Sequence, residues 1–287
     1  MPTNIEDLIP SNLNPNDAFY TQKGANKQSA QKMMFEPKAQ LVELPSHGYL
    51  YKGITNDEEV LAGSIRIRPM TVNEEKILTT PRMVKSGQAL DGVFQNCIKS
   101  DINVGELLSS DRVYLMLWLR SVSYGNIYKF NMTCPSQTCE KRFEHSVDLS
   151  NHPINEMQDP EVKEPFTFHL PVMGYDLAFR LPRGKDEVEM IKMQNEPKAL
   201  NASDETLVKR MSSVIFSITD PETKKELPKD QIDSFINSMV AGDASLFREE
   251  LIRLDAGVED IKGIACPHCG HEFDSPIPIT ENFFRST

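Results

Sequence analysis

The sequence predicts an α+β fold in which antiparallel β-hairpins and helical segments follow an extended N-terminal arm. Short runs alternate polar and apolar residues, as half-buried strands do, whereas longer runs repeat apolar residues every three or four positions, as amphipathic helices do. Two similar cysteine pairs lie far apart in the chain, one before its middle and one near its C-terminus.

The composition is that of a globular protein. The chain has 287 residues, of which 39% are hydrophobic and 25% charged, so it is long enough for one large domain or two modest ones. The formal net charge of -11 argues against a general nucleic-acid binder, because affinity for phosphates comes from clustered Lys and Arg. No apolar run reaches the roughly 18 residues of a membrane span, and the start MPTNIEDLIP lacks the basic and apolar regions of a signal peptide. We therefore expect a soluble, intracellular protein that binds neither nucleic acid nor membrane.

Residues 1–38 are expected to form an extended N-terminal arm. This stretch is rich in Asn, Gln, Pro and Ser, and alone it cannot bury enough apolar surface to offset the entropy of ordering. It is either a frayed terminus or an arm that becomes ordered on a partner. Its spaced apolar side chains suit the second interpretation; they are Ile5, Leu8, Ile9, Phe19, Tyr20, Met33, Met34 and Phe35.

Residues 39–125 are expected to form an α+β segment with strands first and helices after them. The runs AQLVELP and SIRIRPM are separated by turn residues and should pair as antiparallel strands. Thr71 and Glu74 form a capping-box pattern that opens a short helix, and Pro81 fits the first turn of a second helix through GVFQNCI. A third helix across GELLSSDRVYLMLWLRSVS has only a narrow polar face, so Trp118 is expected in the core.

Residues 126–183 are expected to contain the first cysteine knuckle and further hairpins. NIYKFNMT alternates as a half-buried strand, RFEHSVDLS reads as its partner, and FTFHLP with YDLAFRLP predicts a hairpin turned at VMG. Residues 184–256 are expected to be a helical insert made of KDEVEMIKM, DETLVKRMSSVIFSI, KDQIDSFINSMV and DASLFREELIRLD. Ser203 or Asp204 and Asp243 are the expected N-caps. The second knuckle follows within residues 257–287.

The two cysteine pairs have matching surroundings. The first lies in MTCPSQTCEKRFEHSVDL and the second in IACPHCGHEFDSPIPI. Each has Pro directly after the first Cys and Phe four residues after the second, and each lies between two expected strands. Two hairpin knuckles that pack tip to tip complete a tetrahedral shell of four thiolates, as in a zinc ribbon.

The sequence therefore predicts a split zinc ribbon with one structural zinc. Thiolates are soft ligands, and zinc accepts a closed tetrahedron without redox chemistry. The alternatives are two unrelated thiol pairs, a redox disulfide, or competition from His268 and His271, which flank the second knuckle. The expected ligands are Cys134, Cys139, Cys266 and Cys269.

An enzyme is not expected. A zinc ion with four protein ligands has no open position for water or substrate, so catalysis by the metal is not implied. The sequence contains no Walker loop, GxGxxG, HExxH or GxSxG motif. The fifth cysteine, Cys97, lies among apolar residues at helical spacing and is expected to be a buried thiol. We expect a non-catalytic protein without a small-molecule substrate.

Several segments together resemble the T-even-type bacteriophage baseplate protein family, which is associated with assembly of the central baseplate hub. The strongest pattern is the order LPS-x-G, then IRPMT-x-x-EE-x-IL, then SYGN before a CP knuckle. The segments that carry the resemblance are VELPSHGYLY, SIRIRPMTVNEEKILT, GQALDGVFQNCI, LWLRSVSYGNIYKFNMTCPSQTC and CPHCGHEFDSPIPITENFF.

This resemblance implies a structural or assembly component of a contractile phage tail baseplate, in the hub region. Its partners would be other baseplate, hub and tail proteins, bound through the N-terminal arm. It would be made in the host cytoplasm and end in the virion tail baseplate. The alternatives are a transient baseplate assembly chaperone absent from the mature virion, and a zinc-ribbon nucleic-acid or transcription accessory factor. Phe283 and Phe284 would be either the closing core contact of the ribbon or an exposed aromatic anchor for a neighbouring subunit.

Overall fold

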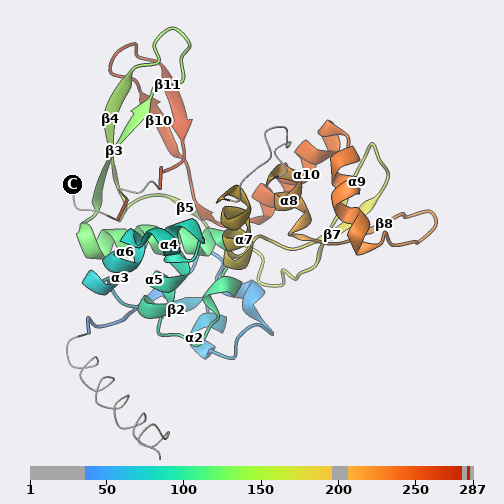
Figure 1. Cartoon of the computed structure of the whole chain (residues 1–287), viewed down its shortest axis with the longest axis horizontal. Helices are drawn as coiled ribbons and strands as arrows, with labels where there is room; N and C mark the ends of the chain where they lie inside the picture. Colours follow the sequence, from blue (N-terminus) through green and yellow to red (C-terminus); the bar gives the residue numbers. More distant parts are fainter. Residues whose placement is uncertain (1–35, 196–205, 280–282, 285–287) are drawn as a thin grey trace, which may run out of the picture. The chain divides into compact units, whose positions relative to one another are not determined.

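The computed structural model describes residues 36–195, 206–279 and 283–284. The chain divides into two units, Met1–Lys38 and Ala39–Thr287, and all described elements belong to the second. The predicted N-terminal arm and the expected caps Ser203 and Asp204 lie outside the described residues, apart from 36–38. The α+β class is confirmed, because helices alternate with two- and three-stranded antiparallel sheets across the described ranges (Figure 1).

The N-terminal part of the second unit is a short sheet with helices packed on it. β1 (Gln40–Glu43) and β2 (Ser64–Ile67) pair antiparallel, as predicted. The capping box of Thr71 and Glu74 is also confirmed. The helix predicted from Pro81 is divided into two by Gly87, whose φ of 72° no α-helix accommodates. The helical elements here are η2 (Tyr49–Tyr51), α2 (Glu58–Leu61), α3 (Val72–Thr79), α4 (Pro81–Lys85) and α5 (Ala89–Cys97).

The long helix α6 (Ser109–Tyr124) follows the 3-10 turn η3 (Val104–Glu106) and lies in the main hydrophobic core. Leu115 and Leu119 are fully buried, and Trp118 is half-buried against the same core. Cys97 is buried, as expected. No helix in the described ranges is long and apolar enough to cross a membrane.

Two hairpins carry the cysteine pairs. On the first, Tyr128 and Phe130 are buried while Ile127 and Lys129 are exposed, so the predicted alternation is confirmed. A short third pairing joins the segment after the first hairpin to the segment before the second. The hairpins are β3 (Ile127–Thr133) with β4 (Arg142–Asp148) and β10 (Ile261–Ala265) with β11 (Glu272–Ser275), and the third pairing is β5 (Ile154–Asn155) with β9 (Gly257–Val258).

A second hydrophobic cluster forms where helices pack on a three-stranded sheet of order β6-β7-β8. The predicted hairpin turned at VMG is confirmed as β6 with β7. The elements are β6 (Phe166–His169), β7 (Asp176–Phe179), α7 (Gly184–Asn195), α8 (Thr206–Ser212), β8 (Ile215–Thr219), η4 (Lys229–Gln231), α9 (Ile232–Ser238) and α10 (Ala241–Leu254).

The expectation of an all-helical insert over 184–256 is wrong for residues 215–219. The predicted helix ends at Ser212, and Ile215–Thr219 forms a strand that pairs with β7. Ile215 and Ile218 are buried from this strand, which β-branched side chains favour. Asp243 was also expected to be an N-cap, but it lies inside the first turn of α10 and its carboxylate accepts hydrogen bonds from the backbone N–H groups of Val172 and Met173.

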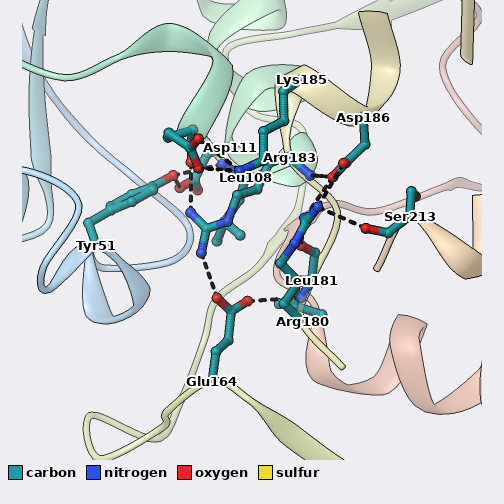
Figure 2. Close-up of polar contacts among 11 residues, drawn as sticks. Tyr51, Leu108, Asp111, Glu164, Arg180, Leu181, Arg183, Lys185, Asp186 and Ser213 are labelled. Carbon is teal, nitrogen blue, oxygen red and sulfur yellow. Dashed lines mark hydrogen bonds and ion pairs between the residues drawn. The ribbon is translucent and has the colours of Figure 1, made fainter. Parts of the chain in front are cut away.

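A buried carboxylate connects α6 to the chain after β1. Asp111 accepts a hydrogen bond from the Ser46 hydroxyl at 2.5 Å. It accepts another from the Tyr51 hydroxyl at 2.6 Å (Figure 2). Burial raises the pKa of Asp111, although these hydrogen bonds oppose the rise, and burial together with Asp111 raises the pKa of Tyr51 well above its ordinary value. The Tyr51 hydroxyl also accepts a hydrogen bond from the Leu108 N–H at 3.0 Å.

Two further arginines, Arg183, which is buried, and Arg180, whose side chain is 11% exposed, lie near this carboxylate along the chain that leads into α7 (Figure 2). Arg183 donates to Glu164 at 2.6 Å. Arg180 forms a bidentate pair with Asp186, both distances being 2.7 Å, and also donates to the Ser213 carbonyl at 2.9 Å. Through Arg180, these contacts join Asp186 of α7 to Ser213, which directly follows α8.

Candidate metal centre

Each cysteine pair lies at the turn of its hairpin, and the same backbone hydrogen bond forms within each turn. The Cys134 N–H donates to the carbonyl of Lys141 at 3.0 Å, and the Cys266 N–H donates to the carbonyl of His271 at 2.9 Å. Both acceptors directly precede the returning strand. The two matching sequences therefore fold into turns in which the first cysteine makes the same backbone hydrogen bond.

The four sulfur atoms predicted as ligands come together. All four Sγ atoms lie within 4.8 Å of one another. The Sγ atoms of Cys134 and Cys269 are 3.7 Å apart and those of Cys139 and Cys266 are 3.9 Å apart. A regular tetrahedron with Zn–S bonds of about 2.3 Å has edges of about 3.8 Å. The spacing fits a four-thiolate zinc site, and it is far too long for the roughly 2.0 Å bond of a disulfide.

A small hydrophobic cluster surrounds the sulfur atoms. Cys134 and Cys266 are buried, and Phe143 and Ile264 pack beside them. The ring of Phe143 lies edge-on to that of Phe273, with centroids 6.4 Å apart. These are the two Phe residues that follow the second cysteine of each pair by four positions. Their equivalent positions in the two knuckles are explained by this contact between the hairpins.

The thiols differ in how readily they ionise. Burial opposes ionisation of Cys266, but the backbone N–H groups of His268 and Cys269 outweigh it and lower the pKa to about 7. Burial raises the pKa of Cys134 to about 12. Metal ligands must be thiolates, so Cys266 offers one near neutral pH, whereas Cys134 would need the charge of a metal ion to ionise.

The histidines near the second knuckle do not join the sulfur cluster. Among the described residues, the group around this centre consists of cysteines alone. His268 is exposed, and His271 stacks on Phe273 with ring centroids 6.1 Å apart and ring planes at 17°. Four thiols at tetrahedral spacing form a donor set that suits zinc without a histidine.

The fold and the site define an α+β protein whose four-cysteine cluster is assembled from two separated segments. A family model described as "T4 bacteriophage base plate protein" matches residues 37–285. The chain therefore belongs to this family, which confirms the family resemblance in the sequence. Membership implies other phage baseplate proteins as its partners. No curated protein and no solved structure matches the chain.

Proposed function

We propose that this chain is a non-catalytic structural or assembly component of a contractile phage tail baseplate, acts in the hub region and is stabilised by one structural zinc. The observation that carries the proposal is the family match over residues 37–285. The cluster of Cys134, Cys139, Cys266 and Cys269 supports the zinc. The protein would be made in the host cytoplasm and become part of the virion tail baseplate.

The zinc would stabilise a part of the fold that has little core of its own. Two-stranded hairpins are marginal in water, and in the part of the chain that the structure describes, the cluster between β3–β4 and β10–β11 has just Phe143 and Ile264 as buried residues besides two cysteines. Cys139 and Cys266 are 127 positions apart, so a shared metal would also close a long loop of chain. Metal binding would thus contribute directly to the folding free energy.

Catalysis by this metal is not part of the proposal. Four protein sulfur ligands fill a tetrahedral shell and leave no position for water or substrate. The zinc would act on stability alone. The N-terminal arm, residues 1–38, is proposed to bind neighbouring baseplate proteins, while 39–125, 126–183, 184–256 and 257–287 are the proposed segments of the body.

The proposal is tested by metal content and particle location together. We expect one zinc per purified chain, less zinc in Cys266→Ser, and an unchanged amount in Cys97→Ala, which removes a thiol outside the cluster. Immunodetection in purified virions would support a permanent subunit. A chain without metal contradicts the structural zinc. Presence in assembly intermediates with absence from virions favours the transient chaperone, and salt-dependent binding to DNA favours the nucleic-acid factor.

A further inference from the structure

A cavity of about 510 Å³ lies among α6, α7, α8 and α10. Its volume is within the range of small-molecule pockets, about 300–1,000 Å³. The walls are mostly apolar and come from separate elements; they include Val113, Met116, Met190, Val214 and Leu251. Methionine side chains adapt to different occupants, which suits a site for another protein's side chain.

The charged side chains that line this cavity differ in whether they are ion-paired. Asp186 is held by Arg180, as Figure 2 shows, and Glu187 accepts from the Arg112 Nε at 3.0 Å. Arg210 also lines the cavity, is exposed, and forms no ion pair within the described part of the chain. The charge that remains available to an occupant is therefore positive.

A buried hydroxyl lines the same cavity. The Oγ of Ser109 is inaccessible to solvent and has no hydrogen-bond partner among the described residues. Leaving such a group unpaired costs about 1–3 kcal/mol, and unpaired buried groups are rare in native proteins. Because solvent does not reach this oxygen, an occupant would remove that cost only after the Ser109 side chain rotates about χ1 and brings its hydroxyl into the cavity. This observation is independent of the charge of Arg210.

We propose that the cavity receives a bulky apolar side chain from another baseplate protein, with an acidic residue beside it that pairs with Arg210. The inference rests on the proposed function for the class of partner. Apolar anchors that enter a pocket supply most of the affinity of such contacts, and a neighbouring charge pair sets specificity. A carboxylate suits the guanidinium fork of Arg210, and a polar atom next to the anchor would pair with Ser109.

The occupant is identified by cross-linking from the rim. Gln194 is exposed and lines the cavity, so a photoreactive p-benzoylphenylalanine replaces it in the full chain. The chain is co-expressed with the baseplate proteins of the same genome, and cross-linked residues are located by mass spectrometry. We expect cross-links to one baseplate protein, next to an apolar residue that has Asp or Glu within one helical turn. Cross-links confined to the same chain or to a second copy, or none, would overturn the proposal.

Charge reversal tests the role of Arg210. Arg210→Glu should weaken the complex roughly tenfold, and changing the partner's acidic residue to Arg should restore it. Arg248→Glu is the matched control, because Arg248 is exposed on α10 and does not line the cavity. Equal effects of the two reversals, or no rescue, would overturn the charge pairing.

Removal of the buried hydroxyl should affect the free chain and the complex differently. Ser109→Ala removes an unpaired group, so the free chain should be as stable as before or more so, while the complex weakens by roughly two- to tenfold. An unchanged complex would contradict the role of Ser109. A chain that binds no baseplate protein would overturn both this inference and the proposed function, whereas a complex indifferent to Arg210→Glu and Ser109→Ala overturns this inference alone.

Discussion

Phe283 lies edge-on against Tyr128, with ring centroids 4.9 Å apart and ring planes at 78°. Phe283 is fully buried in the main core, and the Tyr128 hydroxyl donates to the Pro278 carbonyl at 3.0 Å. The segment after the second knuckle is thus packed against the first strand of the first hairpin. Phe283 is thus a buried core residue and not an exposed anchor, but the cluster it joins is the main core and not the one around the four cysteines of the ribbon.

Phe283→Ala is expected to lower the free energy of unfolding by about 3–5 kcal/mol, because it leaves a cavity beside Tyr128. Phe284→Ala is the matched control, since Phe284 is only half-buried and should cost less. Urea unfolding followed by circular dichroism measures both. Equal losses for the two variants would show that the packing of Phe283 is not what holds this segment.

The parts of the fold that the sequence predicts are those with local signals. The alternation of β3, the capping box at Thr71 and the two cysteine knuckles each lie within a short stretch of chain, and all are present. The sequence predicts a helix where β8 forms, because the spacing of Val208, Met211 and Ile215 is helical, whereas pairing with β7 decides the structure. Tertiary pairing overrides local periodicity in such short segments.

Other features have no local signal at all. The hydrogen bond between Tyr51 and Asp111 joins residues 60 positions apart, and nothing near either residue indicates it. The cavity lined by Ser109 and Arg210 is likewise formed by helices from distant segments. The cysteine cluster is also long-range, but it could be predicted because cysteines are rare and the two turns match.

The buried pair of Arg68 and Glu74 provides a test by substitution. Both side chains are at most 2% exposed, and the two Nη atoms of Arg68 each lie 3.1 Å from a carboxylate oxygen of Glu74. Glu74→Gln removes the buried carboxylate that both Nη atoms of Arg68 contact, so the free energy of unfolding should fall by about 3–5 kcal/mol. Glu58→Gln, at an exposed position in the first turn of α2, should change it by only a few tenths.

The same pair predicts a dependence on pH. Burial alone would raise the pKa of Glu74, but hydrogen bonds from Arg68 and Thr71 lower it to about 2. A lowered pKa in the folded state stabilises the fold above the ordinary value of 4.5, and this contribution is lost as the pH falls towards 2. The difference in unfolding free energy between the native chain and Glu74→Gln should therefore shrink over this range. A difference that stays constant from pH 5 to pH 2 would contradict the assignment.

Ionisation of Asp255 should change the stability in the opposite direction, lowering it as the pH rises. Burial and the nearby Asp111 charge raise its pKa to about 6, although Ser110 and the Ala256 N–H donate to it. Ionisation in the fold therefore reduces stability as the pH rises from the ordinary 3.8 through 6. Asp255→Asn should stabilise the chain above pH 7, by up to about 3 kcal/mol, and have little effect at pH 4. The exposed Asp260→Asn serves as control, and a benefit of Asp255→Asn that is equal at both pH values would refute the prediction.

Removal of the proposed zinc should loosen the ribbon and leave the second hydrophobic cluster in place. The amides of Cys134 and Cys266 are hydrogen-bonded inside the knuckles, so after chelation they should exchange with deuterium faster, together with the rest of β3–β4 and β10–β11. Amides of β7 belong to the second cluster and should keep their protection. Acidification should produce the same pattern, because protons compete with zinc for the thiolates.

Cys97→Ala should respond to chelator as the native chain does, and Cys266→Ser should show fast exchange before any chelator is added. Uniform acceleration across the chain would mean that the metal holds the whole fold, and no acceleration would mean that the four thiols do not bind a stabilising ion.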